Sequence, residues 1–406
     1  MKTAAQRLGF SSERLSRIEP FLERQYLAPG RLPGALTLVA RRGEIAHLSV
    51  QGLADVERAV PLSEETIFRI YSMTKPITSI AFMMLVEEGR VALEDPVEAY
   101  IPTWRDLGVF VAGGPGAFQT RRPTRPMQIV DLLRHTSGLT YGFQNRGNID
   151  AAYRKAGIGE MASATPLAEM IEKLATIPLE FSPGEAWNYS VSTDVLGHLI
   201  GEISGVPFAD FVRERITGPL GMVDTDFHVP AAKAGRLAAC YNRSPSGGLA
   251  LQDDPATSAY LKPPAYQSGG GGLVSTAADY LRFCSMLLGG GRLGSERLIS
   301  RKTLSLMTAN HLPGGADLTE LSRSLFSESV YAGVGFGLGF AVLVDPAKAL
   351  LPSSAGEYYW GGAASTAFWI DPAEEIAVVF LTQLIPSSAW PIRRQLRTLV
   401  YAALDD

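Results

Sequence analysis

The chain of 406 residues has only two cysteines, Cys240 and Cys284, and only five histidines. Two cysteines give neither a disulfide framework nor the spacing of a thiolate metal site. The histidines stand singly, with no His-x-x-x-His pair. The sequence therefore predicts no metal and no cofactor, and the two thiols suit a reducing compartment.

Long apolar runs and an excess of one charge are also missing. The longest apolar stretches, near residues 77–86 and 376–382, fall far short of the ~20 residues that span a bilayer. Gln6 and Arg7 interrupt the N-terminal segment before the apolar core of a secretory signal can form. A net charge of -4 leaves no basic face for phosphates. We therefore expect a cytoplasmic protein with no membrane or nucleic-acid partner.

Strand patterns lie at both ends of the chain, and helical patterns lie between them. Strand-like runs occupy residues 35–40, 45–50, 336–344, 365–370 and 375–384. Helical spacing marks residues 12–25, 74–88, 128–134, 167–175, 193–203, 208–216, 277–288, 301–307 and 391–404. This order predicts an α/β (α+β) fold, in which an antiparallel sheet is flanked by terminal helices and a helical lobe is inserted. We place the discontinuous α/β domain at 1–95 and 230–406 and the helical domain at 96–229.

Ser72-Met73-Thr74-Lys75 is the first candidate for chemistry. Residues three apart share one face of a helix, so the Lys75 amine can reach the Ser72 hydroxyl. The helix that follows is apolar nearly all round, which predicts burial of Lys75. Burial disfavours an ammonium ion and makes the amine a plausible base. On its own the motif fits a capped, buried helix equally well.

Two further segments carry candidate groups. Tyr189 lies in a turn-rich stretch just before the helix at 193–203, where its phenol can share a proton with a lysine. Gly361 and Gly362 follow Trp360 at the start of a strand, and glycines there allow close approach of a backbone or a substrate. Taken singly, Tyr189 fits ordinary packing and the glycines fit a bulge. The run Gly269–Gly272 is interpreted as a tight turn or as close packing at the cleft.

Taken in order, these motifs resemble the serine β-lactamase and penicillin-binding-protein superfamily, closest to the family VIII carboxylesterases. The segments 132–139, 181–184 and 219–222 are similar to that family as well. The resemblance implies a β-lactamase-like fold and an acyl-enzyme mechanism. Ser72 is the implied nucleophile, Lys75 and Tyr189 share the base role, and the backbone N–H groups of Ser72 and Ala363 form the oxyanion hole.

The chain departs from β-lactamases at two positions. Val191 stands where those enzymes usually have Asn, and Trp360 stands where they have the Lys that recognises a substrate carboxylate. Trp offers an apolar face with one N–H donor. We therefore expect Trp360, Gly361 and Gly362 to contact a small, neutral, short-chain ester.

Other functions stay open alongside the carboxylesterase interpretation. They are a β-lactamase or D-amino-acid peptidase, an acyltransferase that uses the same acyl-enzyme, and a non-catalytic penicillin-binding-like module. A Ser-His-Asp hydrolase of the α/β kind is excluded, because no Gly-x-Ser-x-Gly nucleophile elbow occurs in the sequence.

Overall fold

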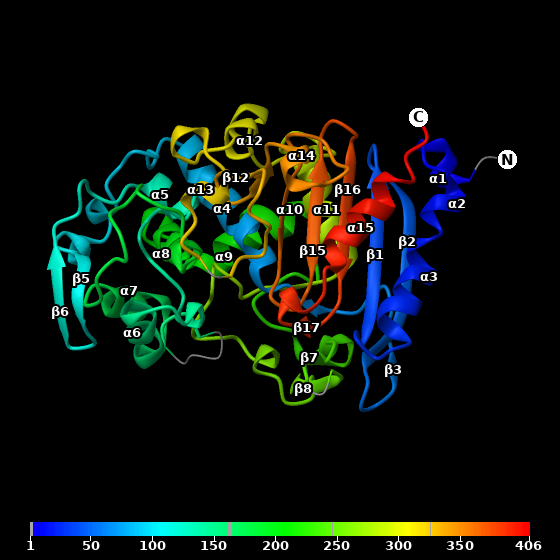
Figure 1. The fold of residues 1–406 in the computed structure, drawn as a ribbon, viewed down its shortest axis with the longest axis horizontal. Helices are drawn as coiled ribbons and strands as arrows, with labels where there is room; N and C mark the ends of the chain where they lie inside the picture. Colours follow the sequence, from blue (N-terminus) through cyan, green and yellow to red (C-terminus); the bar gives the residue numbers. More distant parts are fainter. Residues whose placement is uncertain (1–2, 161–164, 246, 325) are drawn as a thin grey trace.

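An eight-stranded antiparallel sheet forms one side of the molecule (Figure 1). The computed structural model describes residues 3–160, 165–245, 247–324 and 326–406. The strands follow the order β12-β13-β14-β15-β16-β1-β2-β3. β1 (Gly34–Arg41) pairs with β2 (Glu44–Asp55) on one side and with β16 (Ile376–Leu381) on the other. Both ends of the chain therefore build one sheet, as the sequence predicts.

Helices cover both faces of this sheet. All eight residues of β1 are buried, which is expected of a strand with packing on both sides. Helix α15 (Ile392–Tyr401) packs with α2 (Ser12–Leu15) and α3 (Ile18–Leu22) on one face, and α11 (Ala277–Leu288) packs on the other. The remaining strands of this sheet are β3 (Val60–Pro61), β12 (Val334–Phe336), β13 (Ala341–Leu343), β14 (Tyr358–Gly361) and β15 (Ala367–Asp371).

Two elements that the sequence predicts as continuous are interrupted in the structure. The helix expected at 12–25 is divided into α2, α3 and a π-helical turn at Glu23–Leu27. Pro20 is the third residue of α3, where a backbone N–H needs no partner within the helix, so a new helix accommodates it without loss. The strand expected at 336–344 is divided into β12 and β13. Gly339, with φ 99°, turns the chain between them and packs so closely on α4 (Thr74–Glu87) that a Cβ would lie 2.2 Å from Ser79 Oγ.

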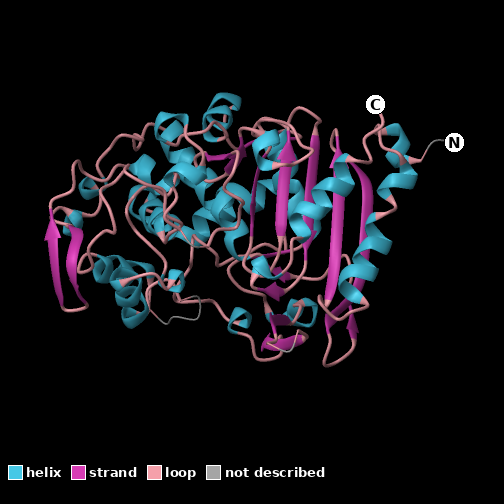
Figure 2. Ribbon diagram, viewed as in Figure 1, coloured by secondary structure: helices cyan, strands magenta, loops and turns pink. Residues whose placement is uncertain are grey.

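The segment between residues 96 and 229 carries most of the remaining helices (Figure 2). Predicted helices are confirmed as α5 (Ile129–Leu133), α7 (Leu167–Leu174), α8 (Ser192–Ser204) and α9 (Phe208–Val212). Helix α6 (Asn148–Ala156) and the hairpin of β5 (Val109–Gly114) and β6 (Ala117–Arg121) were not predicted. The hairpin is largely exposed. Its sequence signal, an apolar run at residues 109–112 before the glycine-rich turn at 113–116, was missed. The division into domains at 96 and 229 stays a prediction.

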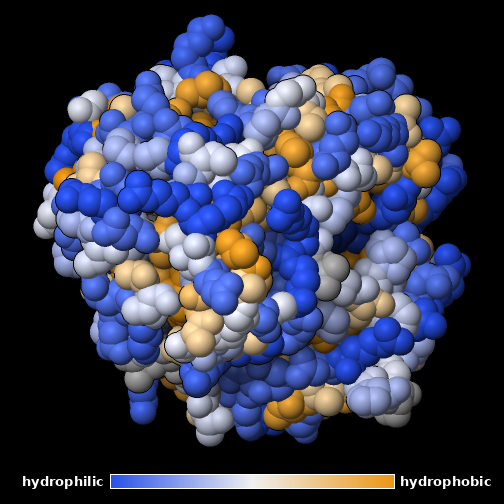
Figure 3. Space-filling model, turned by 60° about the vertical axis from the view of Figure 1, so that its left-hand side comes forward, coloured by the Kyte–Doolittle hydropathy of each residue, from blue (hydrophilic) through white to orange (hydrophobic). Residues whose placement is uncertain are grey.

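No single helix within the described residues is long and apolar enough to cross a bilayer. One bent pair, Ser192–Ser204 with Phe208–Leu220, reaches that length and composition only as a whole, with an 87° angle between its parts. On the face shown in Figure 3, hydrophobic residues form separate patches between hydrophilic ones.

Candidate active site

Ser72 lies at the start of the buried helix α4 and opens into a cavity of about 420 Å³. The residue before it, Tyr71, has a φ of 43°. A side chain other than glycine is strained in this left-handed region by roughly 1 to 3 kcal/mol, and such strain clusters at functional sites. The turn leaves the Ser72 side chain at the cavity while Lys75, one helical turn later, is only 2% exposed.

The structure brings the three predicted side chains together. Tyr189 OH donates a hydrogen bond to Ser72 Oγ at 2.6 Å. Lys75 Nζ lies 3.4 Å from the same oxygen and 4.5 Å from the centre of the Tyr189 ring. The hydroxyl thus lies within hydrogen-bond distance of both candidate acid–base groups, which is the geometry that proton transfer from a serine requires.

Aromatic rings hold the Tyr189 side chain in place. The Trp187 ring lies parallel to it at 6.2 Å, and His135 contacts it edge-on at 5.2 Å. His135 is 1% exposed and its Nδ1 lies 3.1 Å from Ser190 Oγ. The imidazole therefore supports the phenol from behind rather than reaching the cavity.

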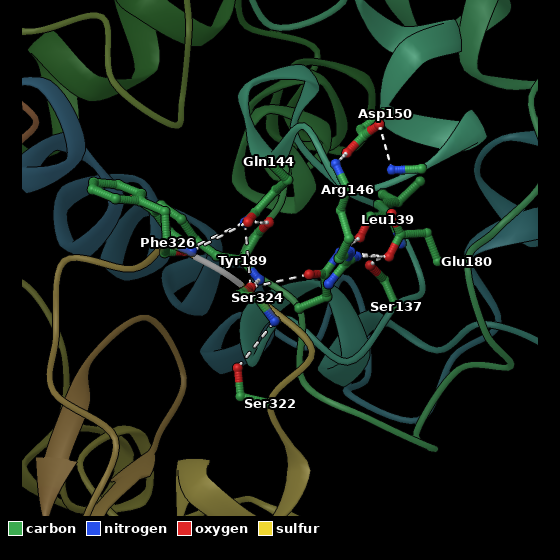
Figure 4. Close-up of polar contacts among 12 residues, drawn as sticks. Ser137, Leu139, Gln144, Arg146, Asp150, Glu180, Tyr189, Ser322, Ser324 and Phe326 are labelled. Atoms are coloured by element: carbon green, nitrogen blue, oxygen red, sulfur yellow. Dashed lines mark hydrogen bonds and ion pairs between the residues drawn. The ribbon is translucent and has the colours of Figure 1, made fainter.

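The backbone of Tyr189 is fixed by polar contacts from two other segments (Figure 4). Its N–H donates to Ser324 Oγ at 2.7 Å, and its C=O accepts from Gln144 Nε2 at 3.4 Å. Ser324 Oγ in turn donates to Asn188 Oδ1 at 3.0 Å. The backbone N–H and C=O of Tyr189 are thus both hydrogen-bonded. These contacts hold the residue in the position from which its hydroxyl reaches Ser72.

Burial moves the pKa values of the two acid–base groups in opposite directions. It lowers the pKa of Lys75 from 10.5 to about 8, although Asp194 and Glu328 partly oppose this by their negative charge. Burial raises the pKa of Tyr189 well above 10, and Glu328 adds to that effect. Near neutral pH the phenol is protonated and a fraction of Lys75 is the free amine, so the amine is the group able to accept a proton.

A second tyrosine, Tyr141, completes the surroundings of the amine. Lys75 Nζ donates to Tyr141 OH at 3.0 Å and to the Gly270 carbonyl at 2.7 Å. Sequence reasoning missed Tyr141, because it lies in a loop with no fixed spacing from Ser72 or Tyr189. It did single out Gly269–Gly272, and the structure shows close packing at the cavity: a Cβ on Gly270 would lie 2.8 Å from Tyr141 OH.

Ala363 lines the same cavity as Ser72, on the loop between β14 and β15. Its backbone N–H has no acceptor among the described residues. Gly362, the residue before it, fits directly over the chain that leads to Ser72, because a Cβ there would lie 2.4 Å from the Ile70 carbonyl oxygen. The loop therefore lies beside Ser72, and its part in an oxyanion hole with the Ser72 N–H stays a prediction.

Trp360, in contrast, does not line this cavity. It is 1% exposed and packs edge-on against Tyr189 at 5.4 Å and against Phe336 at 5.3 Å. The indole also borders a separate cavity of about 390 Å³. Aromatic rings of Tyr71, Phe143 and Phe326 are among the described lining of the cavity at Ser72, and the contact of Trp360, Gly361 and Gly362 with a substrate stays a prediction.

Arg393, on α15, ties the Ala363 loop to the rest of the site. Its Nη2 donates to the carbonyl oxygens of Gly362 and Thr366, both at 2.7 Å. Its Nη1 lies 2.8 Å from the carboxylate of Glu328, whose side chain is 1% exposed. One guanidinium therefore holds both ends of the loop and neutralises a buried acid beside the cavity. Neither residue was a candidate from the sequence.

The described lining of the cavity contains two acids, Asp194 and Glu328, and no lysine or arginine. An anionic substrate group therefore finds no cationic partner there. Throughout the described part of the chain, no three His, Cys, Asp or Glu side chains are grouped as metal ligands.

Comparison with known proteins agrees with this architecture. The family model described as Beta-lactamase matches residues 22–402. An uncharacterized protein of Mycobacterium tuberculosis is 36% identical over 89% of this chain and 88% of its own length. Esterase EstB of Burkholderia gladioli is 33% identical, with 93% of each chain covered.

A solved structure extends the likeness to three dimensions. EstCE1, described as a hydrolase with promiscuous acyltransferase activity, is 28% identical and superposes with a TM-score of 0.81 over 98% of this chain and 99% of its own. The family match covers nearly the whole sequence, and the fold and the Ser-Lys-Tyr grouping agree with it. The chain belongs to the Beta-lactamase family and is an enzyme of the serine β-lactamase-like hydrolase superfamily.

Proposed function

We propose that this protein is a carboxylesterase that cleaves short, neutral esters through an acyl-enzyme on Ser72. The observation that carries the proposal is the convergence of Tyr189 OH and Lys75 Nζ on Ser72 Oγ, at 2.6 and 3.4 Å, in a cavity whose described lining has no cation. The similarity to EstB and to EstCE1 supports ester substrates.

In the proposed first step, Ser72 Oγ attacks the ester carbonyl carbon and its proton passes to the neutral amine of Lys75. The carbonyl oxygen becomes an oxyanion that accepts hydrogen bonds from the backbone N–H groups of Ser72 and Ala363. One such donor contributes about 2.7 to 4 kcal/mol to the transition state. A backbone donor does not depend on the residue at position 360, so the oxyanion hole is compatible with Trp360.

In the second half of that step, the alkoxide leaves with a proton from the Lys75–Tyr189 pair, and the acyl group stays on Ser72. Water then attacks the acyl-enzyme, and the same pair takes its proton and returns one to Ser72 Oγ. Lys75 and Tyr189 act as one coupled unit, so an apparent pKa in a rate profile belongs to the pair.

The substrate class follows from the charges at the cavity. A β-lactam presents a carboxylate, which needs a cationic partner to offset its loss of hydration. Glu328 is ion-paired with Arg393, so Asp194 is the acid of the lining that opposes such a group, whereas a neutral ester meets aromatic rings. We therefore expect ester cleavage to outweigh β-lactam cleavage by a wide margin.

An acyltransferase is the second candidate, and the printed description of EstCE1 as a hydrolase with acyltransferase activity favours it. The acyl-enzyme would be the same, and an alcohol rather than water would attack it. Adding a primary alcohol to an ester assay and measuring the new ester against the free acid separates the two.

The test of the proposal has two parts. A serine-reactive phosphonate should label Ser72, as located by mass spectrometry, and Ser72→Ala should lose esterase activity while Ser79→Ala, in the same helix, keeps it. The kcat/KM for a short p-nitrophenyl ester should exceed that for a chromogenic cephalosporin. A label at another residue rejects the assigned nucleophile, and a preference for the cephalosporin replaces the esterase by a β-lactamase.

A further inference from the structure

Asp194 is a buried carboxylate that the proposed mechanism does not use. It lies in the first turn of α8, five residues after Tyr189, and is 1% exposed while lining the cavity. Its Oδ1 accepts hydrogen bonds from Ser268 Oγ at 2.5 Å and from the Gly270 N–H at 3.0 Å. Both donors are neutral. A buried negative charge is costly without a compensating partner, so its presence at the cavity calls for a role.

The Gly270 peptide connects this carboxylate to the amine of Lys75. Gly270 donates its N–H to Asp194 Oδ1 and accepts the Lys75 Nζ hydrogen bond at its carbonyl, at 2.7 Å. A side chain at this position is excluded, because a Cβ would lie 2.6 Å from Asp194 Oδ2. The glycine therefore allows the loop to lie directly between the carboxylate and the amine.

We propose that Asp194 is a positioning residue for Lys75, acting through the Gly270 loop and through its own charge. The inference rests on the proposed function, because it concerns the group that takes the proton of Ser72. The loop hydrogen bond keeps Nζ within reach of Ser72 Oγ. The charge sets how much of the amine is protonated at a given pH.

The direction of the charge effect follows from the surroundings of the amine. Burial lowers the pKa of Lys75 to about 8, and Asp194 is the first of two groups that raise it again; Glu328 is the second. The other titratable groups that face this pair among the described residues are three tyrosines and a histidine: Tyr141, Tyr189, Tyr266 and His135. Burial keeps all four neutral near pH 7. Arg393 forms an ion pair with Glu328, so Asp194 is the carboxylate whose charge is tested on Lys75.

The variant Asp194→Asn removes the charge and keeps an oxygen that can accept both hydrogen bonds. We expect its pH profile of kcat/KM for p-nitrophenyl butyrate to have the acid limb shifted to lower pH by roughly half a unit or more, with a plateau within a few-fold of wild type. Asp194→Glu, which retains the charge, serves as the control and should keep the limb nearer to its original pH. A purely structural role for Asp194 would lower activity at all pH values without moving the limb.

The outcomes separate this inference from the proposed function. A wild-type enzyme that cleaves no ester and takes no phosphonate label on Ser72 contradicts the proposed function. An active wild type with a folded Asp194→Asn variant of unchanged acid limb contradicts the role of Asp194. If Asp194→Asn does not fold, Ser268→Ala removes the hydrogen bond that Ser268 Oγ donates to Asp194. We expect its kcat to fall several-fold while the acid limb of the pH profile stays at the wild-type pH. An unchanged kcat overturns the proposal.

Discussion

At the scale of single residues, the site works by placing unlike groups around one hydroxyl. Ser72 Oγ has a phenol on one side and an amine on the other, and each group has its own support: aromatic rings around Tyr189 and three oxygens around Lys75. The two tyrosines near Ser72 therefore have different expected roles. The Tyr189 hydroxyl contacts Ser72, the proposed nucleophile, whereas the Tyr141 hydroxyl accepts a hydrogen bond from the Lys75 amine.

Removing the two hydroxyls separately should show this difference. Tyr189→Phe should lower kcat for p-nitrophenyl butyrate by about 100-fold or more, since general acid–base groups contribute 10² to 10⁴. Tyr141→Phe should cost about tenfold, because Lys75 keeps its hydrogen bond to Gly270. Tyr153→Phe, at a buried tyrosine of α6 outside the cavity lining, is the control. Equal losses for the first two variants would contradict the assignment.

The same grouping predicts the pH dependence of the reaction. The active form requires Lys75 as a free amine, and burial lowers its pKa to about 8. Below that pH the amine is protonated, so kcat/KM should fall about tenfold per pH unit on the acid side and level off above about pH 8. The measurement is kcat/KM of the wild type between pH 6 and pH 9, on an ester whose spontaneous hydrolysis is subtracted. A flat profile across this range would exclude a lysine with the lowered pKa as the base.

At the scale of elements, the sequence predicts helices and paired strands better than it predicts their interruptions. The apolar surface of α4 and the strand-like runs in β1, β2 and β16 are local signals, and these elements form where they are expected. The break at Gly339 depends on contact with a distant segment, because this glycine packs against Ser79 of α4. The largely exposed β5–β6 hairpin was missed although residues 109–112 form an apolar run before a glycine-rich turn.

The residues of the candidate site also differ in how far the sequence alone could identify them. Ser72 and Lys75 are one helical turn apart, so local spacing identifies them. Tyr189 was a candidate from its turn-rich segment before a helix, and its role, like that of Ala363, came from the resemblance to a family. Glu328 and Arg393 meet only because the last helix packs beside a loop from another part of the chain, and no local pattern marks such a contact.

The connection between α15 and the Ala363 loop gives a prediction for a helix far from Ser72 in sequence. Arg393→Lys keeps the charge opposite Glu328 but cannot reproduce the fork that reaches both Gly362 O and Thr366 O. The Ala363 N–H should then lose its fixed direction, so kcat should fall about tenfold while KM changes little. Arg394→Lys is the matched control, since Arg394 is half-buried and, among the described residues, its guanidinium donates to the Leu350 carbonyl rather than to the Ala363 loop. A loss of the same size in both variants would contradict the role of the fork.

At the scale of the whole molecule, the two chain ends lie side by side at one edge of the sheet (Figure 1). Phe10 and Leu404 form a backbone bridge, and the Asp405 N–H donates to the Gly9 carbonyl at 2.9 Å. The buried Arg41 forms ion pairs with Asp406 at 2.6 Å and with Glu374 at 3.0 Å. The two ends of the chain therefore contact each other and the last residue of β1 through hydrogen bonds and ion pairs.

This proximity predicts that the enzyme tolerates circular permutation. A flexible linker of about ten residues joining the ends, with new ends between Pro115 and Gly116 in the exposed β5–β6 turn, should keep kcat/KM within a few-fold of wild type and lower Tm by a few degrees. New ends between Ala81 and Phe82, inside the buried α4, should give no folded protein. Circular dichroism and the esterase assay measure both; an unfolded Pro115/Gly116 permutant would contradict the prediction.

The pairing of β1 with β16 also sets an order of events during synthesis. Leu36 lies opposite Leu381 in the finished sheet, so β1 leaves the ribosome long before its neighbour is made. At the usual 5 to 20 residues per second, the wait is roughly twenty seconds to a minute. During that time one edge of a mostly apolar strand is open to pairing with other chains. The Ala363 loop belongs to the same late segment, so a nascent chain has the proposed nucleophile Ser72 early and acquires the proposed oxyanion loop only when translation is nearly over.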